Sequence, residues 1–439
     1  MLGLFLLFFI PIASFGVMSA IFIEVFGHAL PWLSTVIINW WIIHIDFAFV
    51  MDPWCQGLVK IALLIMVFVM PIASLLTWIE RKQSAMMQDR VGPNRAAMRI
   101  PLIGDWRGWG IPHFIADAVK MIMKEDFVPA KANKVLFTLA PLLAIVPVFV
   151  VFSIVPFGGH VCPDSLFKVM HEDPAQCSGS VGFQVAHLDV GLLFYFAIAS
   201  LAVYGTTLAG WASYNKWSLL GGLRASSQMM SYEVTMGMAI LGAFMVYGTL
   251  EPMAIVEAQG PNVLHWGIVS QPLGAILFFT AAIAETKRAP FDIPEGESEV
   301  IGYFVEYSGM RFGIFFLAEF MEVIFAGAIM VTVFFGGWQV PFLAADGFHC
   351  TLLGDFARAI HLGGIADRLS QLPHVLVLLI QMTVWGFKVI FFCWFQLLIR
   401  WTMPRFRPDQ LMRLGWKQLL PVSIANILIT AGFILWRMS

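Results

Sequence analysis

Charged side chains are scarce in this sequence. Aspartate, glutamate, lysine and arginine make up 12% of its 439 residues, about half the usual share in a soluble protein, whereas 59% are apolar. The 26 basic residues are nearly balanced by 28 acidic ones, so the chain lacks the positive excess that attracts nucleic acid. Apolar runs occur throughout, and the longest stretch without one is about fifty residues. This composition excludes a large soluble domain and indicates an integral membrane protein.

Motifs that hold a redox cofactor or a metal are also missing. None of the ten histidines sits in an expected span facing a second histidine, the arrangement that holds a membrane haem. The cysteines and histidines lack the spacing of a zinc or iron–sulfur site, and no glycine-rich phosphate loop follows a strand. We therefore expect no metal and no cofactor bound by this chain alone.

The apolar runs predict an all-α helical bundle. They are too long and too uniformly apolar for barrel strands, and eight have the length of a bilayer span: 57–79, 134–155, 188–212, 227–249, 266–284, 312–336, 375–399 and 417–436. The first 26 residues lack lysine and arginine and exceed a usual signal core, which favours a retained extra helix. We expect an N-terminal extension over residues 1–56 and one membrane domain over 57–439.

The connecting loops alternate in positive charge. Lysine and arginine concentrate in loops 80–133 and 400–416, whereas 156–187 holds only Lys168 and 250–265 holds none. Basic loops stay on the cytoplasmic side of a membrane, so loops 80–133, 213–226, 285–311 and 400–416 are expected there. Loop 337–374, the weakest point of this pattern, contains a stretch that could form an amphipathic surface helix.

Four of the five cysteines fall in the loops expected on the outer side. In a bacterial periplasm disulfides are permitted, so Cys162–Cys177 and Cys55–Cys350 are candidate bridges. Unpaired thiols in a long insertion are the alternative.

Ionisable residues inside the expected spans are the next signal. Glu233, Glu319, Glu322 and Lys388 lie well within apolar segments, where a charge costs several kcal/mol unless it is paired or hydrated. Such groups often mark an ion route, and burial favours proton exchange by a carboxyl group. The structural alternative is an ion pair, for example between Glu319 and Lys388.

The segment ETKRAPFDIPEGESEVIGYFVEY, residues 285–307, gathers acids between two spans. Pro290 and Pro294 prevent a continuous helix, and the interleaved aromatic and aliphatic residues indicate a half-buried loop. Crowded carboxyl groups that lose water repel one another and exchange protons near neutral pH. The six acids of the segment are Glu285, Asp292, Glu295, Glu297, Glu299 and Glu306. The sequence predicts a hydrated proton path from the cytoplasmic face through this group and on through Glu319 and Glu233 into the membrane, and a solvated run of charge is the alternative.

The first basic loop predicts a surface helix. Phe114, Ile115, Ala118, Val119 and Ile122 share one stripe, typical of a helix that lies in the membrane interface.

Five motifs resemble one family. They occur in order from about residue 57 to the end: ERKQSAMMQDRVGPNRA, FIADAVKMIMKEDFVPA, SSQMMSYEV, AETKRAPFDIPEGESEVIGYFVEYSGMRFGIFFLAEF and RFRPDQLMRLGWKQLLP. Together they resemble the NuoH family, a membrane subunit of NADH:quinone oxidoreductase (respiratory complex I). The long acidic motif is the most specific.

The resemblance implies an eight-helix core that forms a quinone-access tunnel, docks the peripheral arm and begins a proton path. In this family the proton path is associated with the positions of Glu233, Glu285, Glu295, Glu297, Glu299, Glu306 and Glu319. The quinone tunnel or its rim is associated with the positions of Arg81, Asp117, Arg288, Phe291, Asp292 and Arg405.

The resemblance also implies partners and a location. Quinone is the substrate, while FMN and iron–sulfur clusters are expected in partner subunits. The expected neighbours are the peripheral-arm iron–sulfur and quinone-site subunits, small membrane subunits, antiporter-like subunits and membrane lipid. The expected location is a bacterial inner membrane, and activity is expected only in the assembled complex.

Some features depart from the family, and other classes stay open. Lys287 stands where the family usually has asparagine, Pro408 where tyrosine is common, and segments 1–56 and 156–187 exceed its plan. A membrane subunit of a related energy-converting hydrogenase is one alternative. A stand-alone secondary ion transporter would show internal symmetry, which we do not find. A passive membrane anchor would not need buried acids.

Overall fold

The computed structural model describes residues 57, 60–100, 104–162, 180–296, 299–343 and 374–438. Within these ranges the chain is a helical membrane protein with very little strand, as the apolar runs predict. Several predictions fall outside the described residues: the extra N-terminal helix, the surface helix after residue 343, and the side chains of Cys55, Cys177, Glu297 and Cys350. The division at residue 56 stays a prediction for the same reason.

The described elements follow one another as helices with two small hairpins. The helices are η1 (Ala62–Val69), α5 (Met70–Met87), η2 (Gly108–Gly110), α6 (Pro112–Met123), α7 (Lys134–Val151), η3 (Phe152–Ile154), α8 (Gly191–Ala212), α9 (Lys216–Tyr247), α10 (Pro252–Gln259), η6 (Val263–His265), α11 (Gly267–Ser270), α12 (Pro272–Glu285), α13 (Gly309–Phe334), α16 (His374–Thr402), α17 (Pro408–Arg413), η7 (Leu414–Leu419) and α18 (Leu420–Met438). Strand β1 (Met98–Ile100) pairs antiparallel with β2 (Gly104–Trp106), Met98 opposite Trp106, and β3 (His160–Val161) pairs with β4 (Val181–Gly182), His160 opposite Gly182.

Six helical segments among the described residues are long and apolar enough to cross a membrane: Lys134–Ile154, Gly191–Ala212, Lys216–Tyr247, Gly309–Phe334, His374–Thr402 and Pro408–Arg437. Each matches a predicted span. The predicted span 57–79 coincides largely with η1 and α5, and 266–284 with α11 and the shorter apolar helix α12. The chain is therefore a multi-pass membrane protein, and the number of eight core spans stays a prediction.

One predicted loop is wrong. Segment 213–226 is mostly helix, because α9 begins at Lys216, where the Asn215 side chain accepts a hydrogen bond from the backbone of Trp217. The adjacent Gly221 and Gly222 suggest a loop in the sequence but serve close packing. A Cβ at Gly221 would lie 2.9 Å from the backbone nitrogen of Tyr303, so α9 can approach the acidic loop closely.

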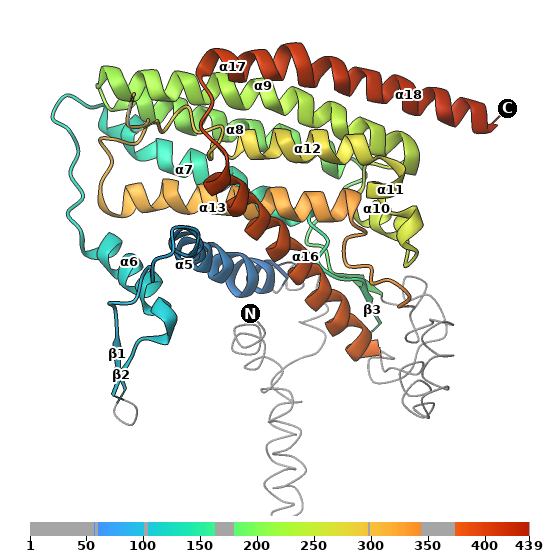
Figure 1. Ribbon diagram of the computed structural model, residues 1–439, viewed down its shortest axis with the longest axis horizontal. Coiled ribbons are helices and arrows are strands. Elements are labelled where there is room, and N and C mark those ends of the chain that lie inside the picture. The colour runs from blue at the N-terminus through green and yellow to red at the C-terminus, as the bar shows by residue number, and fades with distance from the viewer. Residues whose placement is uncertain are drawn as a thin grey trace, which may run out of the picture. The chain divides into compact units, whose positions relative to one another are not determined.

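Helix α13 lies at the centre of the described bundle and is the most buried of the spans. It contacts α5, α7, α12 and α16, while α9 packs against α8, α12 and α18 (Figure 1). Its interior positions include Phe320, Ile324 and Phe334, all nearly without exposed surface. Glutamates at positions 319 and 322 are therefore carried into the protein interior rather than toward lipid.

The two groups of loops gather at opposite ends of the bundle, as the charge pattern predicts. At one end Ser308 donates to the carbonyl of Glu125 over 2.9 Å, and the backbone of Phe406 donates to Pro290 over 3.0 Å. At the other end His160 lies 2.8 Å from Glu257. In Figure 1 the first end lies to the left, with α6, and the second to the right, with β3 and α10. The described parts of these loops thus support the predicted alternation.

Cys162 is disulfide-bonded. Its predicted partner, Cys177, lies outside the described residues, so the Cys162–Cys177 pairing stays a prediction. Cys393 in α16 is a free, buried thiol.

Candidate functional site

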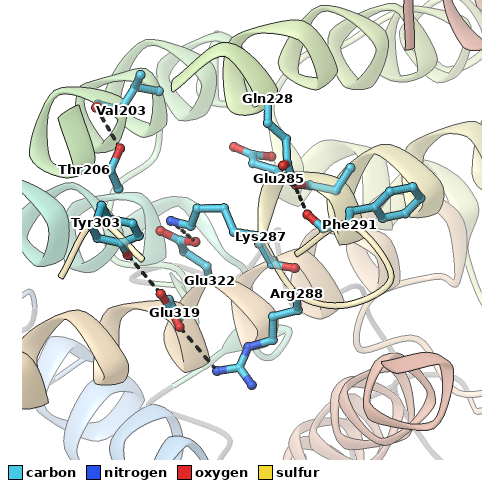
Figure 2. A network of polar contacts seen from close by, with 12 residues as sticks. Val203, Thr206, Gln228, Glu285, Lys287, Arg288, Phe291, Tyr303, Glu319 and Glu322 are labelled. Carbon is cyan, nitrogen blue, oxygen red and sulfur yellow. Dashed lines mark hydrogen bonds and ion pairs between the residues drawn. The ribbon is translucent and has the colours of Figure 1, made fainter. Parts of the chain in front are cut away.

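The acidic segment forms an irregular, largely buried loop between α12 and α13. Residues 286–308 contain no helix or strand where they are described, as the two prolines predict. Gln228, buried in α9, donates from Nε2 to the carbonyls of Ala284 (2.6 Å) and Phe291 (2.7 Å). These two bonds fasten the loop to α9 (Figure 2). Because Gln228 is polar and deep in a span, it positions this segment rather than facing lipid.

Arg288 is the central cation of the loop. Its Nη1 donates to Oε2 of Glu80 over 2.9 Å, and its Nη2 lies 3.8 Å from Oε2 of Glu319. The guanidinium also stacks over the ring of Phe320, with its carbon 3.9 Å from the ring centroid. Glu80 is shared, because Arg400 at the end of α16 forms an ion pair with its other oxygen. Helices α5, α13 and α16 thus meet the loop through one buried charge network.

Glu319 and Glu322 project from the same face of α13 toward the loop, as their spacing predicts. The hydroxyl of Tyr303 donates to Glu319 over 2.9 Å, and Nζ of Lys287 lies 3.3 Å from Oε2 of Glu322. Figure 2 shows both carboxylates turned toward the cations of the loop. The ion pair between Glu319 and Lys388, given above as the structural alternative, is a wrong prediction.

Lys388 has a different environment. Its Nζ donates to the carbonyls of Phe335 (2.8 Å), Gly337 (3.1 Å) and Gln339 (2.7 Å), and it lies over the ring of Trp266. These carbonyls follow the end of α13, where the last helical carbonyls lack partners within the helix. Lys388 therefore caps α13 at the end of the bundle away from the acidic loop.

Glu295 lies close to Glu319 in the same cluster. Burial raises the pKa of Glu295 well above its ordinary value, and the nearby Glu319 carboxyl raises it further. Two carboxyl groups that are close together and poorly hydrated repel each other when both are ionised, so proximity to Glu319 favours the protonated form of Glu295.

Asp292 and Phe291 form the opposite side of the loop. Arg405 donates from Nη2 to Oδ2 of Asp292 over 2.8 Å, and the rings of Phe291 and Phe406 stack with centroids 5.4 Å apart. Burial raises the pKa of Asp292 to about 6, although Arg405 and Arg400 act in the opposite direction. Asp292 therefore changes charge close to physiological pH.

Glu285 links the loop to the middle of the bundle. The hydroxyl of Tyr195 donates to its Oε2 over 3.5 Å, and Glu285, Glu322 and Tyr195 line part of a small, partly open cavity. About 30 Å³ of this cavity can hold the centre of a water molecule, whereas one water needs about 10–15 Å³. Glu233 in α9 is half buried and lies close enough to Glu285 to interact electrostatically.

Other predicted site residues lie apart from this cluster. Glu299 is half exposed and pairs with Arg224 over 2.8 Å. Glu306 accepts from the amide of Asn215 over 2.7 Å at the edge of an open groove. Arg81 pairs with Asp117 over 2.7 Å and joins α5 to α6 in a partly exposed position. The described structure thus divides the predicted residues into a buried cluster and a rim.

Sequence reasoning missed several residues of the cluster. Glu80, Arg400, Tyr303 and Gln228 are essential to its contacts but were not among the predicted site residues. A polar residue inside or at the edge of a span was the available signal for Glu80 and Gln228. Their partners are more than fifty positions away in the chain, so the sequence alone could not pair them.

The cluster has an excess of acid. Its carboxyl groups outnumber its cations: Glu80, Glu285, Asp292, Glu295, Glu319 and Glu322 against Lys287, Arg288, Arg400 and Arg405. Unbalanced carboxylates in a poorly hydrated interior take up protons to reduce their repulsion. The arrangement can therefore store and exchange protons. Among the described residues, no group of three or more histidine, cysteine or acidic side chains could hold a metal ion.

Comparison with known proteins agrees with this geometry. The protein family described as NADH dehydrogenase matches residues 59–431. The H subunit of NADH-quinone oxidoreductase from Bdellovibrio bacteriovorus is 39% identical over 388 residues, covering 84% of this chain and 94% of the relative. The corresponding protein from Rhodothermus marinus, numbered 8 among the subunits of the same enzyme, is 40% identical over 374 residues, covering 84% and 95%.

A third relative is of the same kind. The H subunit of NADH-quinone oxidoreductase from Salinibacter ruber is 40% identical over 368 residues, covering 83% of this chain and 92% of the relative. Identity at this level over most of both sequences confirms the resemblance carried by the five motifs. This chain belongs to the NuoH family of NADH-quinone oxidoreductase, the membrane subunits of respiratory complex I.

Proposed function

We propose that this chain forms the quinone-access tunnel of a bacterial inner-membrane complex I, docks its peripheral arm and begins its proton path. The observation that carries the proposal is the buried excess of carboxyl groups beside Arg288. Quinone reduction adds negative charge and consumes protons. A nearby group of acids that already shares protons can supply them and respond to the change in charge.

The proton path runs from the loop into the bundle. It begins at Glu295 and Glu319, continues along α13 to Glu322, and crosses the small cavity to Glu285 and Glu233. The cavity has room for about two waters. Its wall is mostly apolar, and the polar side chains that line it are Glu285, Glu322, Tyr195 and Thr286. Glu299 and Glu306, at the rim, connect this interior to the cytoplasmic surface, and Glu297 belongs to the same segment of the chain.

The quinone route approaches the loop from the side of α5 and α6. The apolar stripe of α6 is exposed in the isolated chain, with Val119 52% and Ile122 65% accessible. An apolar surface of this kind suits a long isoprenoid tail, and Arg81 with Asp117 marks its polar edge. Phe291 and Asp292, with Arg288 and Arg405 beside them, then offer aromatic and charged contacts to a quinone head group.

Partner subunits supply what this chain lacks. FMN and iron–sulfur clusters are assigned to the peripheral arm, whose quinone-site subunit completes the reaction site at the cytoplasmic loops. The small membrane subunits and antiporter-like subunits receive the proton path on the side of Glu233. Exposed apolar residues along α9, such as Met230 and Val234, suit contact with a neighbouring membrane subunit or lipid.

The test is Glu295→Gln in the assembled complex, in sealed membrane vesicles. Glutamine keeps the size of the side chain but cannot exchange a proton, so NADH-driven quinone reduction and proton uptake should both fall about tenfold or more. Glu257→Gln is the matched control, because Glu257 is partly exposed at the other end of the bundle, and it should keep both rates. Full retention of both activities in Glu295→Gln would overturn the proposal.

A further inference from the structure

Lys287 is a buried cation inside the acidic cluster. Only 2% of its surface is exposed, and its Nζ lies 3.3 Å from Oε2 of Glu322. Isolated lysine is costly to bury, so its presence requires compensation by nearby carboxylates. Burial alone would lower the pKa of Lys287, but Glu322, Glu319 and Glu295 together raise it. The amine is therefore charged in the folded protein.

The backbone at Lys287 is also unusual. Its φ of +56° lies in the left-handed region, which is unfavourable for lysine and which glycine and asparagine adopt more easily. Backbone conformations of this kind cluster at functional sites, which makes Lys287 a candidate functional residue. The sharp turn directly after α12 directs the amine back toward α13, as Figure 2 shows.

The charged groups around Lys287 come from every neighbouring element. Glu322 and Glu319 face it from α13, Glu295 from the loop and Glu285 from the end of α12. Arg288 follows it in sequence but turns to Glu80 of α5 and Glu319, and Tyr303 donates to Glu319. Tyr195 of α8 and Glu233 of α9 reach the cluster through Glu285. Lys287 is thus the cation that pairs directly with Glu322.

We propose that Lys287 is a positioning residue for proton transfer: it holds Glu322 as a carboxylate and thereby sets how many protons the cluster carries. The inference rests on the proposed function and deepens it. With Glu322 paired to a fixed cation, Glu322 carries a proton only while one passes along the path, and the protons that the cluster stores lie on other carboxyl groups, beginning with Glu295. Lys287 itself does not give up a proton, and it touches neither quinone nor the reacting atoms.

The direction of the effect follows from electrostatics. Removing Lys287 takes away a positive charge that favours the ionised form of every surrounding carboxyl group. Each of these groups then keeps its proton to a higher pH, and a neighbouring charge at this distance shifts such an equilibrium by about 1–3 pH units. The carboxyl-dependent limb of the pH profile must therefore move to higher pH, whether the acid or the carboxylate is the active form.

The experiment uses Lys287→Asn in the assembled complex, because asparagine accepts the left-handed backbone and has no charge. The pH profile of NADH-driven quinone reduction and proton uptake should move upward by about one unit or more. The double variant Lys287→Asn/Glu322→Gln removes both charges. Its pH profile should therefore lie close to that of the unchanged protein. Lys134→Asn, at an exposed cation of the same end, is the control and should not move the profile.

Two readouts separate the possible failures. The redox-induced infrared difference spectrum should gain protonated-carboxyl absorption in Lys287→Asn, which a purely structural loss would not produce. A lower yield of complex with an unmoved pH profile and unchanged carboxyl absorption would overturn this inference. If Glu295→Gln is inactive in the same preparation, the proposed function stands despite that result. If Glu295→Gln is fully active, the proposed function fails instead.

Discussion

Arg288 donates to Glu80 over 2.9 Å although 208 positions separate them in the chain. The contact joins α5 to the acidic loop, and both side chains are nearly buried. Glu80 simultaneously pairs with Arg400, so one carboxylate holds two guanidinium groups from different parts of the bundle. Loss of this carboxylate would take the ion-pair partner from Arg400 and leave Arg288 with the more distant Glu319, 3.8 Å away.

We therefore predict that Glu80→Gln destabilises the subunit by about 3 kcal/mol or more, since removing one partner of a buried ion pair leaves an uncompensated charge. The midpoint of thermal dissociation of the detergent-solubilised complex measures the effect. Asp117→Asn is the comparison, because the Arg81–Asp117 pair is partly exposed and worth less than about 1 kcal/mol. Equal midpoints for the two variants would show that the Glu80 network does not stabilise the subunit.

Asp292 should make stability depend on pH. Its pKa in the folded protein is about 6, above the ordinary 3.8, so the folded state binds its proton more tightly than the unfolded state does. The stability it contributes is therefore fully present below pH 4 and is lost as the pH rises through 6. Asp292→Asn removes this pH dependence. The difference in unfolding free energy between the variant and the unchanged protein should therefore shift by about 1 kcal/mol in favour of the variant from pH 5 to pH 7.

Thermal dissociation measured at both pH values checks this prediction. Asp89→Asn, at an exposed position of the same end of the bundle, should give the same difference from the unchanged protein at pH 5 and pH 7. An Asp292→Asn difference that does not change with pH would mean that Asp292 keeps one charge state over this range.

The sequence predicted the elements better than their contacts. Hydropathy located the spans because lipid requires long apolar helices, and Pro290 and Pro294 located the irregular loop because proline interrupts a helix. The start of α9 was missed because Gly221 and Gly222 are loop signals locally, whereas here they allow close packing, Gly221 against the backbone of Tyr303 and Gly222 against the backbone of α8. The deep charges were found individually, but the partner of Lys388 was not, because backbone carbonyls of a distant segment have no signature in sequence.

Gln228 should be required for the shape of the acidic loop. Leucine at this position fits an apolar helix but removes the Gln228 hydrogen bonds to the carbonyls of Ala284 and Phe291, which then keep only their backbone donors, Lys287 and Ile293. Each lost hydrogen bond costs about 0.5–1.5 kcal/mol. We predict that Gln228→Leu lowers the amount of assembled complex and its quinone-reduction rate. Ser227→Ala, one position away, removes a bond to the same turn of α9 at an exposed site and should leave both unchanged. Normal assembly and rate in Gln228→Leu would contradict this positioning role.

Lys388 distinguishes a structural charge from one on the proton path. Its three carbonyl partners fix it at the end of α13, on the far side of the bundle from Glu295. Lys388→Met removes those hydrogen bonds and should destabilise the subunit by about 1–3 kcal/mol, because buried carbonyls then lack donors.

The number of protons taken up per NADH oxidised should stay the same in the complex that assembles with Lys388→Met. Simultaneous measurement of NADH oxidation and proton uptake in vesicles gives this ratio, with Lys134→Asn as the control. A lower ratio in Lys388→Met would place this lysine on the proton path, since loss of helix capping alone reduces the amount of complex and not its stoichiometry.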